Sequence, residues 1–290
     1  MSEISFKTVE GEEKFRTIYD LNLAMWPVDY ETRYITTKFG KTHIIISGPK
    51  DAPPLILLHG FGFGSTMWYA NIGELSKHYR TYAVDIPCDM NKSVSTKPFE
   101  NKRECAMWLS MLLDELELEK VSMIGHSAGG WQTINFAIHH QNRLEKMVLL
   151  APAASFIPFK KQFFIRLFSI MLFPLRRNVI NAFCKWFVAP GNHVHEGLYE
   201  QFYVGLKNYK FKKVITPSVF SDEELSSIKI PTYLLVGDKE VIYNPVSAIN
   251  SAKEKVQHIE TKMVHLAGHA LSIEKFDEVN SLIISFLRSK

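Results

Sequence analysis

Apolar residues in this chain fall in short, nearly uninterrupted runs separated by patterns with helical spacing. The run Leu55–Leu58 has no polar position that could face solvent, which is typical of a strand buried on both faces of a parallel sheet. Similar runs recur along the chain. We therefore expect strands at Thr42–Ser47, Leu55–His59, Thr81–Asp85, Val121–Gly125, Met147–Ala151, Thr232–Val236 and His258–Val264.

The segments between these runs have the spacing of helices. We expect helices at Arg103–Leu116, Ala128–His140, Pro245–Val256 and Ser272–Leu287. The last of them places Ile273, Phe276, Ile283 and Leu287 on one face, with Ser272 as a plausible N-cap. Alternating strands and helices predict an α/β fold, with a mostly parallel central sheet flanked by helices and right-handed crossovers.

The alternation stops after the strand that ends at Ala151. Residues 155–213 read as helices rich in aromatic residues, and we interpret them as a helical cap inserted into a core domain made of residues 1–154 and 214–290. The aromatic side chains could line an acyl pocket under this cap or pack it onto the sheet, and both interpretations stay open. They include Phe156, Phe159, Phe163, Phe164, Phe168, Phe173, Phe183, Trp186 and Phe187.

Composition and charge exclude several classes of protein. Hydrophobic residues make up 46% and charged residues 22%, as in ordinary globular domains and unlike a disordered chain. The net charge of +4 is not concentrated in any block of like charges, so we expect no nucleic-acid partner. Three cysteines without a metal-binding spacing, behind a polar N-terminus, favour reduced thiols and a cytoplasmic location.

The most apolar stretch lies in the insertion, and Arg166 interrupts it before it reaches the length of a membrane-spanning helix. We therefore expect no stable membrane insertion. The basic pairs Lys160-Lys161 and Arg176-Arg177 most often mean a solvated face, and they leave open a weak attraction to anionic lipid headgroups.

The strongest chemical signal is Gly125-His126-Ser127-Ala128-Gly129, which lies between an expected strand and an expected helix. This is the context of a nucleophile elbow, a sharp strand-to-helix turn that needs small neighbours and exposes its serine above the sheet. The helix that follows directs its N-terminus at a developing oxyanion. We therefore expect Ser127 to be a catalytic nucleophile.

A second turn of small residues, His59-Gly60-Phe61-Gly62, follows the strand at Leu55. Such a loop lets a backbone N–H approach a substrate carbonyl oxygen. We expect the N–H groups of Phe61 and Ala128 to form the oxyanion hole, although a glycine turn without a ligand role is the alternative. His59 itself reads as a buried structural histidine.

Two late loops carry the groups that could activate a serine. The strand at Thr232–Val236 is followed by Gly237, Asp238 and Glu240, and the strand at His258–Val264 is followed by His265 and His269. A serine hydroxyl needs a general base near neutral pH, and the base needs a carboxylate to fix its tautomer. The order serine, acid, histidine is that of an α/β-hydrolase.

These motifs together resemble the α/β-hydrolase fold serine hydrolases, in particular the capped esterase and lipase-like group, over roughly Thr32 to Lys290. The resemblance implies an acid three residues beyond the loop glycine, which favours Glu240, with Asp238 as the alternative that would otherwise cap the turn or face solvent. It also places the histidine directly after a glycine, which favours His269 over His265. We expect His265 to be a pocket or packing residue.

The resemblance departs from the usual family pattern at one place. The family often continues Asp-x-Pro with a G-x-G-x-S run, whereas Asp85-Ile86-Pro87 is followed here by Cys88-Asp89-Met90-Asn91-Lys92-Ser93. This difference could alter a pocket wall without removing the three catalytic candidates.

We therefore expect a carboxylesterase that forms an acyl-enzyme on Ser127, with no metal and no organic cofactor implied. Its expected partner is a small-molecule ester with a modest, largely apolar acyl group. Alternatives on the same scaffold are a carbon–carbon bond hydrolase, a perhydrolase, and a signalling protein that keeps the triad to bind a ligand. The sequence does not separate these, because a fold does not dictate a function.

Overall fold

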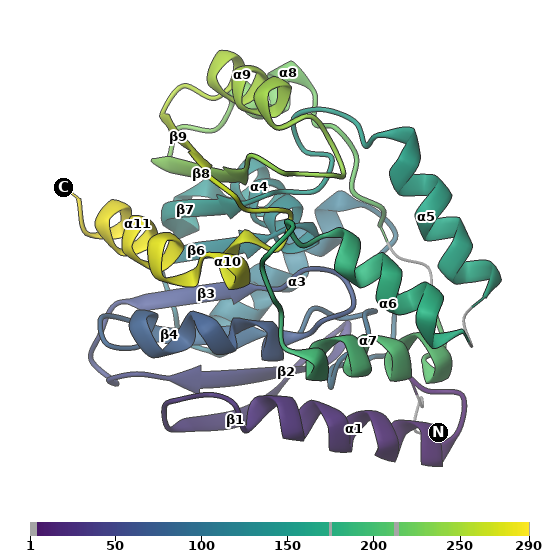
Figure 1. The fold of residues 1–290 in the computed structure, drawn as a ribbon. Coiled ribbons are helices and arrows are strands. Elements are labelled where there is room, and N and C mark those ends of the chain that lie inside the picture. The colour runs from purple at the N-terminus through teal and green to yellow at the C-terminus, as the bar shows by residue number, and fades with distance from the viewer. Residues whose placement is uncertain (1–4, 174–175, 212–214, 290) are drawn as a thin grey trace.

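A nine-stranded sheet runs through the middle of the molecule (Figure 1). The computed structural model describes residues 5–173, 176–211 and 215–289. The sheet has the order β1-β2-β4-β3-β6-β7-β8-β9, with β5 paired to β2, and is parallel from β4 to β9. The strands are β1 (Tyr30–Thr37), β2 (Gly40–Ser47), β3 (Pro54–Leu58), β4 (Arg80–Val84), β5 (Val94–Ser95), β6 (Val121–His126), β7 (Leu144–Leu150), β8 (Thr232–Gly237) and β9 (Ile259–Val264).

All seven expected strands are confirmed, and the sequence analysis missed two. β1 pairs antiparallel with β2 at the edge of the sheet, and its side chains are mostly exposed or half-buried. A strand of this kind has no continuous apolar run by which to find it. The expected fold class is thus confirmed, with an antiparallel hairpin added at one edge.

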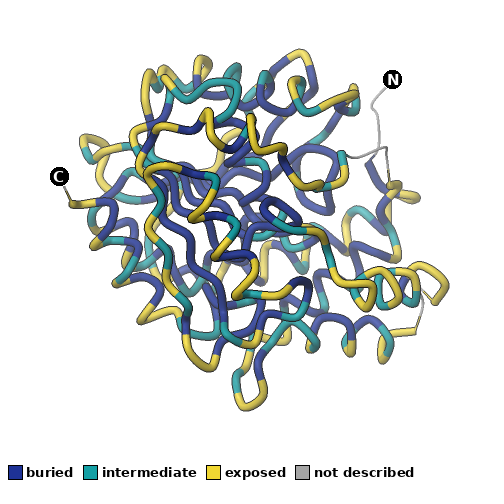
Figure 2. The backbone as a smooth tube through the Cα atoms, turned by 90° about the horizontal axis from the view of Figure 1, so that it is seen from above, coloured by how far each residue is buried: buried dark blue, intermediate teal, exposed yellow. Residues whose placement is uncertain are grey.

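Side chains of the central strands alternate between two hydrophobic clusters, one on each face of the sheet. Leu55 and Leu57 of β3 point into one cluster, and Ile56 and Leu58 point into the other. In Figure 2 the buried segments lie in the middle of the molecule and the exposed ones mostly at its periphery. Burial on both faces explains why these strands read as uninterrupted apolar runs.

Helices cover both faces of the sheet. The first cluster is covered by α1 (Val9–Leu23), α2 (Ile72–Leu75), α10 (Leu271–Glu274) and α11 (Phe276–Arg288). The second is covered by α3 (Lys102–Glu115), α4 (Ala128–His140), α8 (Asp222–Ser226) and α9 (Pro245–Lys255). Short 3₁₀ segments occur at Ser65–Ala70 and Gln141–Arg143.

The C-terminal helix differs from the expectation. It is broken at Lys275, whose φ of −129° and ψ of 43° are not helical, so α10 and α11 are separate helices. Ser272 lies inside α10, fully buried, and is not an N-cap. Phe276 is 41% exposed, whereas Ile283 and Leu287 are buried. The expected N-cap and the single continuous helix were therefore wrong.

Three helices occupy the expected insertion between β7 and α8: α5 (Lys161–Leu172), α6 (Arg177–Trp186) and α7 (Glu196–Asn208). α7 packs against α1, where Asn22 Nδ2 donates to Gly197 O at 2.9 Å and to Gln201 Oε1 at 2.8 Å. The C-terminal boundary of the insertion, at residue 213, lies outside the described residues. Its division from the core domain as a cap stays a prediction.

Candidate active site

Ser127 sits at the sharp turn between β6 and α4. Its backbone has φ of 52° and ψ of −114°, a strained conformation for a residue with a side chain, of the kind that costs about 1–3 kcal/mol. A Cβ on Gly125 would lie 2.3 Å from Gly129 O, and a Cβ on Gly129 would lie 2.2 Å from Leu58 O. Only glycine fits at these two positions, so the turn explains the glycine spacing of the motif.

Backbone hydrogen bonds fix this turn from both sides. The Ser127 N–H donates to Leu150 O at 2.9 Å, and the Ala153 N–H donates to Ser127 O at 3.0 Å. The Ser127 side chain remains partly exposed, while His126 before it is buried. The neighbouring strand thus stabilises the strained residue and leaves its hydroxyl accessible.

The Ser127 hydroxyl lies at the end of a chain of hydrogen bonds. His269 Nε2 is 2.8 Å from Ser127 Oγ, and His269 Nδ1 is 2.7 Å from Glu240 Oε2. Both His269 and Glu240 are buried, at 5% and 4% exposure. The carboxylate selects the tautomer with hydrogen on Nδ1, so Nε2 is free to accept the serine proton. This arrangement can activate the hydroxyl as a nucleophile.

Glu240 is held rigidly in the loop after β8. Its second oxygen, Oε1, accepts hydrogen bonds from the N–H groups of Val241 at 2.7 Å and Ile242 at 2.9 Å. One carboxylate oxygen therefore meets the backbone and the other meets His269. The loop glycine before it, Gly237, has no space for a side chain because a Cβ would lie 2.2 Å from Ala267 O. This close contact brings the acid loop and the histidine loop together.

The two rival residues lie elsewhere. Asp238 Oδ2 is 2.7 Å from His265 Nδ1, and the His265 side chain is 80% exposed. The expectation that His265 is a pocket or packing residue was therefore wrong. The Asp238 side chain is only 15% exposed, and within the described part of the chain it accepts no backbone N–H. It neither faces solvent nor caps the turn, and it pairs with His265 instead of His269.

The Gly60–Phe61 turn lies directly against the serine. A Cβ on Gly60 would lie 3.5 Å from Ser127 Cβ and 2.9 Å from His126 Nδ1. Ala128 is the first residue of α4. Within the described residues, neither the Phe61 N–H nor the Ala128 N–H donates to a protein acceptor. Both groups are therefore free to donate to a substrate oxygen.

Buried side chains anchor this turn from below. His59, which is fully buried as expected, donates from Nδ1 to Gly60 O at 2.9 Å and accepts at Nε2 from the Ile86 N–H at 2.9 Å. The Gly62 N–H donates to Asp89, at 2.9 Å to Oδ2. Burial raises the pKa of Asp89. Asp89 belongs to the stretch in which the sequence departs from the pattern of the family it resembles, and it supports the turn that bears Phe61.

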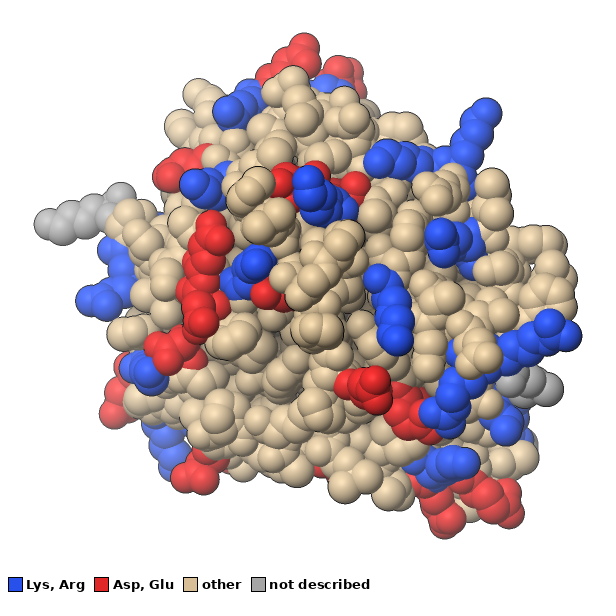
Figure 3. All heavy atoms as spheres, in the orientation of Figure 1, with Lys and Arg blue, Asp and Glu red and all other residues tan. Residues whose placement is uncertain are grey.

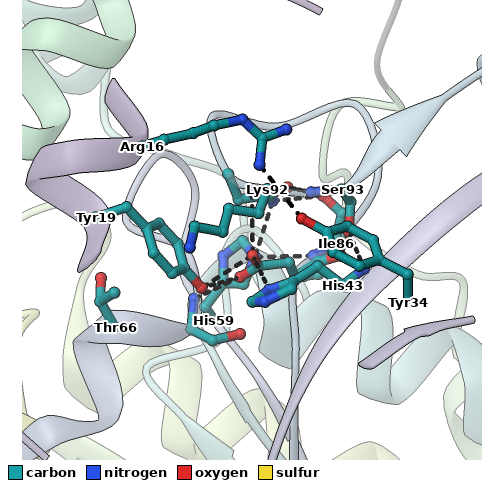
Figure 4. Close-up of polar contacts among 12 residues, drawn as sticks. Arg16, Tyr19, Tyr34, His43, His59, Thr66, Ile86, Lys92 and Ser93 are labelled. Carbon is teal, nitrogen blue, oxygen red and sulfur yellow. Dashed lines mark hydrogen bonds and ion pairs between the residues drawn. The ribbon is translucent and has the colours of Figure 1, made fainter. Parts of the chain in front are cut away.

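A second buried carboxylate, Asp85, follows β4. Figure 4 shows its partners Tyr19, His43 and Lys92 gathered in one polar cluster. It accepts hydrogen bonds from Tyr19 Oη at 2.9 Å, His43 Nδ1 at 3.0 Å, the Ser65 N–H at 2.8 Å and the Lys92 N–H at 3.1 Å. Burial acts to raise the pKa of Asp85, but the hydrogen bond and charge of His43 outweigh it and hold the pKa well below its usual range. The cluster ties α1, β2 and two loops to one ionised carboxylate.

The insertion covers the catalytic histidine candidate. The Phe187 ring lies 5.2 Å from the His269 ring, and the Ala270 N–H donates to Phe187 O at 3.2 Å. Glu274 joins the same two segments, because its carboxylate accepts from the Gly268 N–H at 3.0 Å and the Ala189 N–H at 2.7 Å. Glu274 is not among the residues expected from the sequence, where it looks like any other glutamate in a helix.

No group of three or more His, Cys, Asp or Glu side chains in the described residues is arranged to hold a metal ion. None of the described helices combines the length and the apolar character that a membrane-spanning segment requires.

Known proteins resemble this chain over nearly its whole length. Residues 53–276 match the model of the α/β-hydrolase fold family. The uncharacterized carboxylesterase nap of Bacillus subtilis strain 168 is 40% identical over 96% of this chain and 93% of its own, and carboxylesterase YbfK of the same strain is 38% identical over 98% and 97%. The crystal structure of naproxen esterase from Bacillus subtilis superposes with a TM-score of 0.92, at 38% identity, over 97% of this chain and all of that one.

Proposed function

The chain belongs to the α/β-hydrolase fold family, and we propose that it is a carboxylesterase that works through an acyl-enzyme on Ser127. The observation that carries this proposal is the continuous chain of hydrogen bonds from Ser127 Oγ through His269 to Glu240. The named carboxylesterases among its relatives, similar over nearly the full length, support the ester as the bond that is cleaved.

The proposed reaction begins with attack of Ser127 Oγ on the ester carbonyl while His269 Nε2 takes the hydroxyl proton. Glu240 holds the Nδ1–H and stabilises the imidazolium. The N–H groups of Phe61 and Ala128 donate to the oxyanion, in a turn fixed by His59 and by the start of α4. His269 then protonates the departing alcohol.

Deacylation uses the same groups, with water in the place of the alcohol. A water molecule takes the place of the alcohol, His269 accepts its proton, and hydroxide attacks the acyl carbonyl. The second tetrahedral intermediate collapses, Ser127 recovers its proton from His269, and the carboxylic acid leaves. Each step needs only the side chains and backbone N–H groups of this chain, and water.

We propose that residues 155–213 act as the cap that shapes the acyl site. The packing of Phe187 on His269 and the bonds of Glu274 to both segments support this role. The proposed substrate is a small-molecule ester with a largely apolar acyl group. The proposed location is the cytoplasm, which the buried thiols of Cys105 and Cys184, neither of them in a disulfide, support.

Hydrolysis of p-nitrophenyl esters of increasing acyl length tests the proposal. We expect steady turnover with short acyl groups, and a loss of both turnover and fluorophosphonate labelling in Ser127→Ala. A single stoichiometric release of p-nitrophenol without further turnover would instead favour a ligand-binding signalling protein. No hydrolysis across the whole series, with a folded protein, would overturn the esterase assignment in favour of another reaction on this scaffold.

A further inference from the structure

Helix α5 presents two apolar faces, of which only one is packed. Phe163, Leu167 and Ile170 face the rest of the protein and join its hydrophobic clusters. The opposite side, which we call the outer face of α5, is formed by large apolar side chains that are between 52% and 69% exposed. They are Phe164, Ile165, Phe168, Met171 and Leu172.

The outer face is a contiguous apolar stripe. Its residues recur with a spacing of one, three and four, so they share one side of the helix, and exposed Phe173 extends the stripe beyond the helix end. Scattered exposed apolar residues need no explanation, but a contiguous patch marks a docking surface. None of these side chains is required to pack α5 onto the protein, because the inner face does so.

Along the sequence, all charged residues near this helix are basic. The sequence has no Asp or Glu between Glu145 and Glu196, whereas seven Lys and Arg residues lie there. The whole chain has a net charge of only +4, so the remainder is net acidic. Six of the seven lie in the insertion, around α5 and α6. They are Lys160, Lys161, Arg166, Arg176, Arg177 and Lys185.

Most of these cations are not neutralised by carboxylates. Arg177 forms an ion pair with Glu200, but within the described residues the other five form none. Arg166 and Arg176 lie over the rings of Trp186 and Phe173, at 4.8 Å and 5.0 Å from the ring centroids. In Figure 3 the right-hand flank, where Figure 1 places α5, is largely apolar with blue side chains among the tan.

We propose that the outer face of α5 and its flanking cations form a peripheral docking surface for anionic lipid. Apolar side chains on an amphipathic helix enter the boundary between headgroups and acyl chains, and neighbouring cations attract anionic headgroups. A second copy of this chain is a poorer occupant, because pairing two outer faces would bring two unneutralised clusters of cations together. This proposal concerns binding and does not rest on the proposed function.

Vesicle co-sedimentation of the full chain tests the proposal. We expect binding to vesicles of phosphatidylglycerol and phosphatidylcholine in equal parts, no binding to phosphatidylcholine alone, and loss of binding in high salt. Absence of binding to the anionic vesicles at low salt would overturn it. Concentration-dependent dimers in light scattering that Ile165→Glu abolishes would also overturn it, since a second copy would then cover the face.

Two variants that each add one negative charge distinguish a specific role of the outer face of α5 from a general effect of charge on vesicle binding. Ile165 is 69% exposed on α5, and Leu21 is 66% exposed on α1. We expect Ile165→Glu to weaken vesicle binding at least tenfold and Leu21→Glu to change it less than twofold. Equal weakening by the two would contradict the proposal. Hydrolysis of a soluble short ester and the melting temperature show whether each variant is folded.

A double variant at two exposed lysines tests whether the cations contribute to vesicle binding. Lys160→Gln combined with Lys161→Gln removes two charges and leaves the apolar stripe intact. We expect weaker binding to anionic vesicles and a smaller dependence of binding on salt. An unchanged salt dependence would contradict the role of these lysines.

Discussion

Two buried histidines in the described residues hydrogen-bond to a buried carboxylate, and only one of these two pairs adjoins the candidate nucleophile. His269 lies 2.7 Å from Glu240 beyond β8, and His43 lies 3.0 Å from Asp85 beyond β4. Burial and distance are similar in the two pairs. The difference lies in what surrounds them, so a short histidine–carboxylate contact alone does not identify an active site.

Protein groups occupy the hydrogen-bonding positions around Asp85, whereas His269 has one ring nitrogen directed at an accessible hydroxyl. Asp85 also accepts from Tyr19 and from two backbone N–H groups, and the His43 ring packs against the rings of Tyr19 and Tyr34. His269 directs its second nitrogen at the partly exposed Ser127. Saturated hydrogen bonding favours a structural role, whereas a basic nitrogen beside a strained, accessible hydroxyl favours catalysis.

The largest expected effect is on kcat, and it distinguishes the two carboxylates in the loop after β8. Glu240→Gln removes the charge that orients His269, and we expect kcat for a short p-nitrophenyl ester to fall about 10⁴-fold. Asp238→Asn removes a carboxylate whose partner is the exposed His265, and we expect kcat to change less than about tenfold. A near-inactive Asp238→Asn beside an active Glu240→Gln would reverse the assignment of the acid.

Asp85→Asn is expected to give the opposite pattern. The substitution leaves His43 and its neighbours without their shared charge, and removing one member of a buried pair typically costs about 3–5 kcal/mol. We expect a large fall in melting temperature with kcat largely kept in the folded fraction. Because the pKa of Asp85 is lowered by folding, its stabilisation is present above the unfolded pKa near 4 and is lost as the pH falls further. Asp85→Asn should therefore flatten the acid limb of the stability profile.

The opposite result would contradict a purely structural role for Asp85. If Asp85→Asn abolished turnover without lowering the melting temperature, the Asp85 cluster would have a role in the chemistry. The matched comparison is Glu240→Gln, for which we expect lost turnover in a protein that still unfolds cooperatively.

Cap substitutions are expected to have smaller effects, which depend on the face they occupy. Phe187 packs on His269, whereas Phe168 is 59% exposed on the outer face of α5. We expect Phe187→Ala to change the preferred acyl length of p-nitrophenyl esters several-fold in kcat/KM, because it opens space beside His269. Phe168→Ala serves as the control and should leave the profile unchanged. Equal profiles for both variants would remove Phe187 from the acyl site.

The smallest effect concerns another buried histidine, His126. Burial and the neighbouring His269 lower the pKa of His126 to about 3. A histidine whose pKa is lowered by folding binds its proton more tightly when unfolded, so stability is complete above pH about 6.5 and declines toward pH 3. We expect His126→Gln, whose amide can still donate to His269 O, to reduce this decline in melting temperature. An identical pH dependence in both proteins would contradict the pKa shift.

The sequence predicts what local patterns encode. The elbow is recognisable in five consecutive residues because only glycine fits at Gly125 and Gly129. β3 and its neighbouring strands are recognisable as apolar runs because both of their faces are buried. Glu240 and His269 are favoured in the sequence because the resemblance to α/β-hydrolases places the acid three residues beyond a loop glycine and the histidine directly after a glycine. The structure brings both to Ser127, as the sequence analysis expected of the favoured acid and base.

Features that depend on distant contacts could not be predicted. Tyr19 and Asp85 meet only because α1, a polar helix whose hydrophobic stripe is weak, packs beside the sheet. Glu274 gains its partners from a loop and from the insertion, and β1 is too exposed to have a continuous apolar run. The aromatic residues of the insertion are evident in the sequence, but only the fold shows that Phe187 packs on His269 and that Phe168 is exposed to solvent.

The most direct test of the catalytic assignment is to locate the acyl group during turnover. A p-nitrophenyl ester that deacylates slowly is mixed with the protein, the reaction is quenched in acid, and the peptides are analysed by mass spectrometry. We expect one acyl group per chain, on Ser127, formed and lost at rates consistent with turnover, and absent from Ser127→Ala. Steady turnover with the acyl group on another residue, or undiminished turnover in Ser127→Ala, would contradict the assignment.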